Sequence, residues 1–264
     1  MVFLRFLLIL IILTTTSLIY AQDVQVIGHR GAMGHAPENT ITSVKKALMF
    51  DIDAIEIDVF RCLTGEIVVF HDKLLSKLTN GKGNIENKTL TQLRKLKVMG
   101  TDSIPTLEEV ISVINGKVNL NIELKGKNTA KGVLEIMQQS VLTGKWENHQ
   151  LYVSSFDWDE LREFRELTNQ FRIAVLTDLN PIDAIPIAKE LNAFAINPNH
   201  KKLSYNIVKE IQLDGFKVFT WTVNDTNRIS ELISWGVDAI ITCLLYTSDA
   251  ADEGLGVDLG GRRI

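Results

Sequence analysis

Three short apolar runs near the start of the chain each end in side chains able to do acid–base or metal chemistry. The first run ends at His29 and Arg30, the second carries Glu56 and Asp58, and the third ends at His71 and Asp72. Alternate residues of a strand point to the same side, so Glu56 and Asp58 present two carboxylates to one place. Burying two like charges together is costly unless a cation lies between them. The pattern therefore indicates a metal-assisted phosphate-ester site.

A later apolar run adds further candidates of the same kind. Glu123 and Lys125 end this run, two residues apart and so on one side of a strand. With Glu56 and Asp58, Glu123 completes a set of oxygen ligands that suits a hard cation such as Ca²⁺ or Mg²⁺. Structural zinc would need nitrogen and sulfur ligands instead. Salt bridges from these carboxylates to neighbouring Arg or Lys side chains are the alternative interpretation.

The motifs that hold these residues resemble those of a known family. H-R-G, P-E-N-T, E-I-D-V and V-V-F-H-D occur in this order between His29 and Asp72. Any one of them alone would be weak evidence, but four in register resemble the glycerophosphodiester phosphodiesterase family. The resemblance extends from about residue 24 to Thr242.

The resemblance implies a role for each candidate. The expected metal ligands are Glu56, Asp58 and Glu123, and the expected phosphate-binding residues are Arg30 and Lys125. Arg can grip two phosphate oxygens at once, whereas Lys acts as a point charge. Lys127, two residues further on, is an alternative to Lys125.

The catalytic pair that the resemblance implies is His29 and His71. One imidazole would take a proton from the attacking oxygen and the other would give one to the leaving alkoxide, because imidazole titrates near neutral pH. The sequence leaves open which histidine does which. Phe156 and Trp221 are expected to contact the alcohol part of the substrate, with burial in the core as the alternative. Glu38 and Asn39 are interpreted as structural residues that shape the loop and cap the helix after it.

The implied reaction is hydrolysis of a glycerophosphodiester to glycerol 3-phosphate and an alcohol, which makes a small molecule the expected partner. A vicinal glycerol hydroxyl attacking first, through a cyclic phosphate, would explain two histidines that exchange roles. One alternative is a lipid phosphodiesterase of similar fold acting on lysophospholipid or sphingolipid. Another is a phosphodiester-binding protein without activity. The net charge of −4 argues against a polyanion-binding surface, so no nucleic-acid partner is expected.

Strand and helix patterns alternate along the chain. Strands are predicted at 24–28, 54–60, 118–124, 151–155, 172–176, 193–196, 217–222 and 239–242, and helices at 40–50, 105–114, 129–142, 157–167, 181–190, 204–214 and 226–235. Eight such repeats predict a (β/α)8 barrel over residues 22–242, with a small hairpin and a polar insertion at about 73–102 after the second strand. An open doubly wound sheet is the alternative, but the turn after the first strand lacks the Gly spacing of a dinucleotide site.

The two ends of the chain are predicted to lie outside the barrel. Residues 1–21 have the charged start, apolar run and small-residue end of a secretory signal peptide, so we expect a periplasmic or secreted protein without stable membrane association after cleavage. A membrane anchor is the alternative. Residues 243–264 lack an amphipathic period and resemble a translated sequencing adapter, which predicts a non-native, disordered tail and a barrel without its last helix. Cys62 is then the single native cysteine, so no disulfide framework is expected.

Overall fold

The computed structural model describes residues 24–246, so the predicted signal peptide and most of the predicted tail lie outside the described residues. The described barrel strands are β1 (Gln25–Gly28), β2 (Ala54–Arg61), β4 (Asn119–Leu124), β5 (Leu151–Ser155), β6 (Arg172–Thr177), β7 (Ala195–Pro198), β8 (Lys217–Thr220) and β9 (Ala239–Thr242). The helices between them are α1 (Ile41–Ala47), α3 (Leu107–Ile114), α4 (Ala130–Leu142), α5 (Trp158–Leu167), α6 (Ile185–Glu190), α7 (Tyr205–Leu213) and α8 (Thr226–Ser234).

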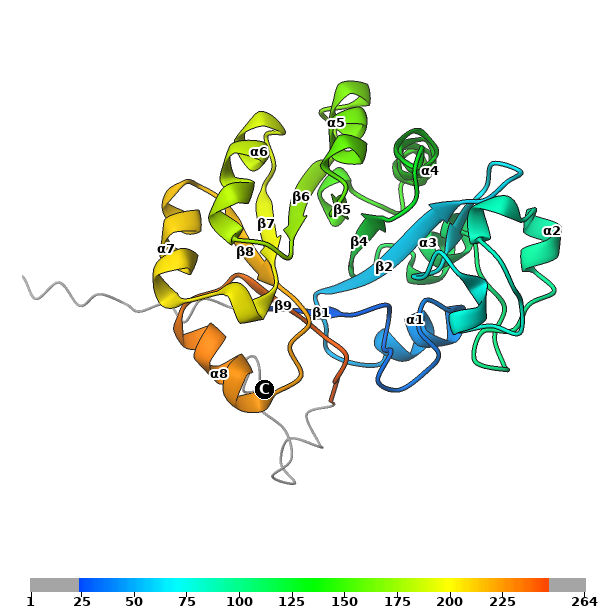
Figure 1. Cartoon of the computed structure of the whole chain (residues 1–264), viewed down its shortest axis with the longest axis horizontal. Helices are drawn as coiled ribbons and strands as arrows, with labels where there is room; N and C mark the ends of the chain where they lie inside the picture. The colour runs from blue at the N-terminus through cyan, green and yellow to red at the C-terminus, as the bar shows by residue number, and fades with distance from the viewer. Residues whose placement is uncertain (1–23, 247–264) are drawn as a thin grey trace, which may run out of the picture.

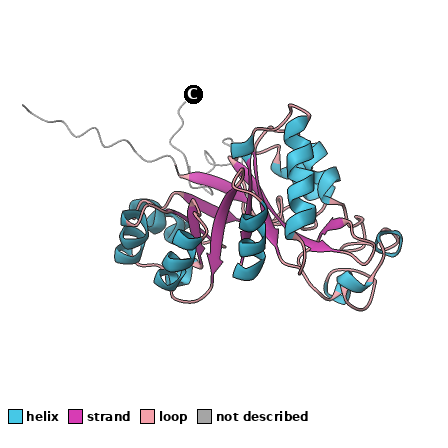
Figure 2. Cartoon of the chain, turned by 90° about the horizontal axis from the view of Figure 1, so that it is seen from above, coloured by secondary structure: helices cyan, strands magenta, loops and turns pink. Residues whose placement is uncertain are grey.

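The strands form a closed parallel barrel. Each strand pairs in parallel with the next, and β1 closes the ring by pairing with both β9 and β2. Figure 1 shows the helices arranged outside the strands, and the rotated view of Figure 2 shows helices on both sides of them. The predicted (β/α)8 fold is confirmed. Because all barrel strands run in the same direction, the residues at their carboxyl ends meet at one rim.

Side chains of β2 alternate between the outer face of the barrel, which packs against helices, and the inner face, which carries the carboxylates. Ile55 and Ile57 face outward into the main core between strands and helices, where both are fully buried. Ala54 faces inward and belongs to an apolar cluster inside the barrel that also contains Tyr152 and Phe219. Glu56 and Asp58 follow Ala54 on the inward face, above this apolar floor.

The segment after β2 forms a small unit with its own core. β3 (Ile67–Val69) pairs antiparallel with β2, as predicted, and is followed by the short helices η1 (Leu75–Lys77), η2 (Ile85–Asn87) and α2 (Leu90–Leu93). The insertion was predicted only to be polar. Several of its apolar side chains are nevertheless buried against one face of the β2–β3 hairpin, and the main ones are Leu75, Ile85, Leu93 and Val98. In Figure 1 the insertion, coloured cyan to teal, lies beside β2.

Two helix boundaries differ from the prediction by more than two residues, the start of α6 and the end of α1. The helix predicted at 181–190 is a 3-10 turn, η4 (Pro181–Ala184), followed by α6. Pro186 lies in the first turn of α6, where its missing N–H is tolerated, so the α-helical part begins only there. The first helix, predicted at 40–50 with Asn39 or Thr40 as its cap, ends at Ala47; Thr40 is the cap, and its side chain accepts a hydrogen bond from the Ser43 amide.

The described chain continues four residues beyond β9 without a further helix. Within these residues Leu245 is only 2% exposed, so the start of the predicted tail packs against the barrel. The foreign origin of residues 243–264 stays a prediction. None of the helices in the described part of the chain is long and apolar enough to cross a bilayer.

The packing of α5 predicts the effect of a core truncation. Phe164 is fully buried in the main core, whereas Leu167, one turn later on the same helix, is 46% exposed. Phe164→Ala should lower the free energy of unfolding by about 3–5 kcal/mol, because it removes buried apolar surface and leaves a cavity. The control Leu167→Ala should change it by about 0.5 kcal/mol or less. Urea unfolding measures both values, and equal effects would show that α5 does not pack as described.

Candidate active site

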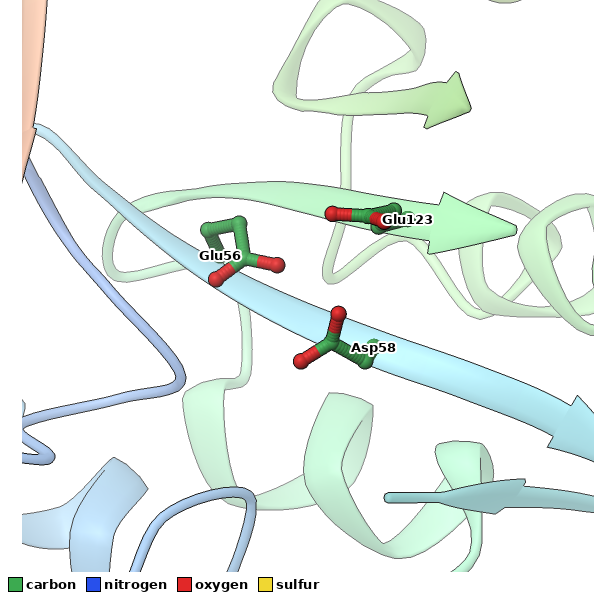
Figure 3. Close-up of side chains that lie close together, drawn as sticks. All are labelled: Glu56, Asp58 and Glu123. Atoms are coloured by element: carbon green, nitrogen blue, oxygen red, sulfur yellow. The ribbon is translucent and has the colours of Figure 1, made fainter. Parts of the chain in front are cut away.

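Three carboxylates converge at the rim of the barrel. Asp58 of β2 lies directly beside Glu123 of β4 in the strand register, and Glu56 precedes Asp58 on the same face. One ligand oxygen from each residue lies within 4.8 Å of the other two, and Figure 3 shows the three carboxylates directed into a shared space. Glu56 and Asp58 are 2% and 1% exposed. The structure thus brings the three predicted metal ligands together from two neighbouring strands.

The electrostatics of this cluster fit a divalent cation. Burial, together with the Asp58 and Glu123 charges, raises the pKa of Glu56 well above its usual value. Burial and the Asp58 charge raise the pKa of Glu123 to about 7. The Oε1 atom of Glu56 is buried and has no hydrogen-bond partner among the described residues. Such an oxygen is costly to bury alone, and a hard cation held between three carboxylates would satisfy it.

Two basic side chains border the carboxylates. The Nε atom of Arg30 lies 3.3 Å from Oδ2 of Asp58, and the Arg30 backbone N–H donates to Oε2 of Glu56 at 2.9 Å. Lys125 donates from Nζ to Oε1 of Glu123 at 2.9 Å and lies 3.7 Å from Oδ1 of Asp58. Lys127, the alternative to Lys125, instead pairs with Asp157 at the surface and takes no part in this cluster.

Glu38 and Asn39 contact the site directly, which the sequence analysis did not anticipate. Asn39 donates from Nδ2 to Oδ2 of Asp58 at 2.8 Å, and its Oδ1 accepts a hydrogen bond from the Asp58 backbone N–H at 3.1 Å. Its side-chain amide therefore forms two hydrogen bonds with Asp58. Glu38 accepts a hydrogen bond from Arg30 at 2.7 Å. Both Arg30 and Asn39 have left-handed backbone conformations, with φ of 51° and 56°. Non-glycine residues seldom adopt this conformation without a functional or structural reason. Glu38 and Asn39 both belong to the P-E-N-T motif, which marked them in the sequence, but their contacts with Arg30 and Asp58 follow only from the three-dimensional structure.

The two histidines line one cavity with the charged groups. The cavity has a volume of about 110 Å³, and its walls include His29, Arg30, Glu123, Lys125 and His71. The Nε2 atom of His29 lies 3.9 Å from Oε2 of Glu56. Burial, reinforced by the Arg30 charge, lowers the pKa of His29 to about 3. Burial also lowers the pKa of His71. Both imidazoles are therefore predominantly neutral at pH 7 in the absence of substrate and metal.

The other ring nitrogen of His29 faces two side chains near the end of the barrel. Its Nδ1 atom lies 3.4 Å from the Thr222 hydroxyl and 3.4 Å from the Cys243 thiol. Cys243 belongs to the predicted non-native tail. No role for either residue follows from the sequence.

Two aromatic side chains complete the cavity wall. Phe156 and Trp221 pack edge to face, with ring centroids 5.2 Å apart and an interplanar angle of 89°. Phe156 is 41% exposed, so the alternative of a purely core role does not apply to it. The Trp221 indole N–H donates to the Asn197 carbonyl at 2.8 Å, which fixes its ring at the cavity. Apolar rings at the open side of a charged cavity suit the non-phosphate part of a substrate.

Comparison with known proteins identifies the family. The sequence matches the model of the Glycerophosphoryl diester phosphodiesterase family over residues 29–242, which is most of the chain. The chain belongs to the glycerophosphodiester phosphodiesterase family. The family resemblance stated from the motifs is confirmed.

Individual members of the phosphodiesterase family are similar over nearly their whole length. YhdW of Bacillus subtilis is 34% identical over 229 residues, which cover 82% of this chain and 93% of that protein. A glycerophosphodiester phosphodiesterase of Caldanaerobacter subterraneus is 31% identical over 226 residues, covering 82% of this chain and 93% of that one. An Oleispira antarctica phosphodiesterase, solved in complex with the product sn-glycerol-3-phosphate, superposes with a TM-score of 0.79 at 29% identity, covering 89% of this chain and 98% of that one.

The contacts of Asn39 predict a role in metal binding for this family member. Asn39→Gly removes both contacts to Asp58 while keeping a residue that tolerates positive φ. Metal affinity should fall about 10- to 100-fold, as when other partners of metal ligands are removed. Asn115→Gly is the matched control, because Asn115 has φ of 52° at the end of α3, away from the site. Calorimetric titration with Ca²⁺ and Mg²⁺ measures both variants, and an unchanged affinity in Asn39→Gly would contradict the assignment.

The raised pKa values predict that metal binding depends on pH. The folded protein without metal holds a proton on Glu123 below about pH 7, and a cation must displace it. Affinity should therefore fall by about tenfold per pH unit as the pH drops below 7, and each bound cation should release about one proton or more there. Calorimetry in two buffers with different ionisation enthalpies measures the release. Binding without proton release at pH 6 would mean that the carboxylates are already ionised.

Proposed function

We propose that this protein hydrolyses glycerophosphodiesters to glycerol 3-phosphate and an alcohol, with a divalent cation and two histidines. The observation that carries the proposal is that a single cavity is lined by both imidazoles, two cationic side chains and carboxylates of the acidic cluster. Relatives named as glycerophosphodiester phosphodiesterases, and a similar structure that holds sn-glycerol-3-phosphate, support the substrate class.

The charge of the site supports a phosphodiester substrate. Four ionised carboxylates, with Glu38 among them, against Arg30 and Lys125 leave two net negative charges, which would repel a phosphate group. A divalent cation would cancel this excess, so that the negative charge of a phosphodiester is no longer repelled. Glu56, Asp58 and Glu123 would hold this cation, either Ca²⁺ or Mg²⁺, which would polarise the phosphoryl oxygens. Arg30 and Lys125 then bind the phosphate oxygens.

The surroundings of the two histidines suggest how their roles divide. His29 is the more buried imidazole, with a side chain 16% exposed against 27% for His71. Its lowered pKa keeps it neutral, as a proton acceptor must be, and its Nε2 atom faces the carboxylate cluster. His71 follows the hairpin; burial lowers its pKa, but the nearby Asp58 and Asp72 charges oppose this lowering and favour its protonated form. We therefore assign His29 as the general base and His71 as the general acid of the first step.

The reaction proceeds in two steps under this assignment. His29 takes the proton of the vicinal glycerol hydroxyl, whose oxygen forms a bond to phosphorus, while the bond from phosphorus to the alcohol oxygen breaks. His71 protonates the departing oxygen, which releases the alcohol and leaves a cyclic phosphate. In the second step His71 takes a proton from water as that water forms a bond to phosphorus, the bond from phosphorus to the vicinal glycerol oxygen breaks, and His29 returns its proton to that oxygen. Glycerol 3-phosphate results, and both histidines regain their starting protonation states.

We also propose that the protein acts outside the cytoplasm, on deacylated phospholipid head groups. This rests on the signal-peptide pattern of residues 1–21. Fractionation of cells that express the full chain tests it, because a mature protein shortened by these residues should appear in the exported fraction.

The decisive experiment for the activity uses purified protein and glycerophosphocholine. Glycerol 3-phosphate should be released, EDTA should stop its release, and Ca²⁺ or Mg²⁺ should restore it. Lysophosphatidylcholine in a parallel assay tests the alternative of a lipid phosphodiesterase. Turnover of the lipid alone would support that alternative, and binding of glycerophosphocholine without turnover would support a non-catalytic protein.

Replacement of His71 tests the acid–base assignment. His71→Ala should lower kcat on glycerophosphocholine by about 10²- to 10⁴-fold, the usual contribution of a positioned proton donor. Its affinity for the cation should stay close to that of the unmodified protein, because His71 is not among the expected ligands. His149→Ala is the control, because His149 is an exposed surface residue. Normal turnover by His71→Ala would remove this histidine from the mechanism.

A further inference from the structure

We propose that Asp72 and Lys77 together position His71 for proton transfer, so that the first turn of the insertion takes part in catalysis. The inference rests on the proposed acid–base role of His71. Asp72 and Lys77 are positioning residues in this proposal, because neither needs to contact the substrate.

A chain of three side chains carries the proposal. The Nδ1 atom of His71 lies 3.5 Å from Oδ1 of Asp72, and the Lys77 Nζ atom donates to that same oxygen at 2.6 Å. The Asp72 side chain is only 15% exposed, so water screens these charges less than it would on an open surface. One carboxylate oxygen thus accepts a hydrogen bond from the ammonium group and lies in charge contact with the imidazole.

The insertion fixes the position of Lys77. Lys77 ends the short helix η1, which begins at Leu75, and Leu75 is fully buried in the insertion core. Phe70, directly before His71, is buried in the same core, and its backbone N–H donates to the carbonyl of Asp58 at 2.9 Å. The two ends of the Lys77–Asp72–His71 chain are therefore attached to one packed unit.

A carboxylate at Nδ1 directs the chemistry of an imidazole to its other nitrogen. It holds a proton on Nδ1, so that Nε2 is the atom that gives or takes the reacting proton. In the first step the Nε2–H of a protonated His71 goes to the leaving oxygen. The neutral ring keeps its Nδ1 proton toward Asp72, and its free Nε2 can then accept the proton of the attacking water. The same orientation serves both steps.

The other charged groups near His71 do not provide this orientation. Arg30 and Lys125 oppose its protonation, and Asp58 favours it from within the carboxylate cluster. Asp58 is already engaged by Asn39 and Arg30. Asp72 is the acidic neighbour that lies outside the expected metal ligands, so it remains available to the imidazole when a cation is bound.

The test compares two substrates in variants of the full chain with saturating Ca²⁺ or Mg²⁺. Glycerophosphocholine releases a basic alkoxide that needs a proton, whereas the p-nitrophenyl ester of glycerol phosphate releases a weakly basic phenolate that does not. Asp72→Asn should lower kcat on glycerophosphocholine on the order of 100-fold, with KM changed less than about twofold, because a positioned proton donor is worth at least this factor. On the p-nitrophenyl ester the single-turnover rate of p-nitrophenolate release, which reports the first step alone, should fall less than about fivefold, since this step then needs little acid catalysis.

Lys77→Met supplies the second variant and Lys73→Met its matched control. Lys77→Met should show the same selective loss to a smaller degree. Lys73 pairs with Glu86 in the same insertion, at 3.1 Å and with the same 61% exposure as Lys77, but it does not contact Asp72. Lys73→Met should therefore leave both substrates unaffected. If Asp72→Asn does not fold, as judged by circular dichroism, the comparison of the two lysine variants decides the question.

The outcomes separate this inference from the proposed function. If His71→Ala loses activity while Asp72→Asn keeps its full kcat, or loses equally on both substrates, positioning by Asp72 is overturned and the catalytic role of His71 stands. If His71→Ala itself remains fully active, the proposed acid–base mechanism is rejected, and the positioning role of Asp72 is rejected with it. The ¹⁵N chemical shifts of the His71 ring give a further readout. They should show Nδ1 protonated in the unmodified protein and a mixture of tautomers in Asp72→Asn.

Discussion

The burial of three carboxylates around one point is the constraint on which the site depends. Like charges in a poorly solvated place raise one another's pKa values, and the apolar floor of the barrel below them offers no compensation. The protein keeps Asp58 and its neighbours in place with two basic side chains and one amide. Every one of these partners comes from a loop that follows a barrel strand. The carboxylates stand on rigid strands, and the groups that balance their charge are supplied by the loops.

The loop after β1 is held in one conformation by its own backbone and by α1. The backbone N–H of Asn39 donates to the backbone carbonyl of Arg30 at 3.1 Å, which joins the two residues with left-handed conformations. Gly31 between them has φ of 82°, and a side chain there would meet the Ser43 hydroxyl at 2.4 Å. This close approach of the loop to α1 explains why H-R-G needs its glycine. Because the loop is locked, Arg30 and Asn39 reach Asp58 without having to become ordered when substrate binds.

The sequence was sufficient for features that repeat or that depend on strand geometry. Alternating patterns predicted the barrel, and the two-residue spacing of Glu56 and Asp58 predicted that their side chains share a face. The meeting of Glu123 with Asp58 followed only from the barrel, since the two residues lie far apart in the chain. Contacts within loops were out of reach: nothing in the residue types says that Asn39 grips Asp58 rather than capping a helix. The insertion core was missed because its apolar residues are spaced irregularly among polar ones.

The hairpin explains how an insertion outside the barrel can influence a site inside it. The two strands of the hairpin present alternate residues to two different cores. Val59 and Val69 face the main core, while Phe60 and Val68 face the insertion core. His71 leaves the hairpin directly after Phe70, so the packing of the insertion sets the backbone position from which its imidazole reaches the cavity. The carboxylates of β2 depend on the barrel for their placement, whereas His71 depends on both cores. A change in the insertion can therefore alter the proposed proton transfer while leaving the expected metal ligands where they are.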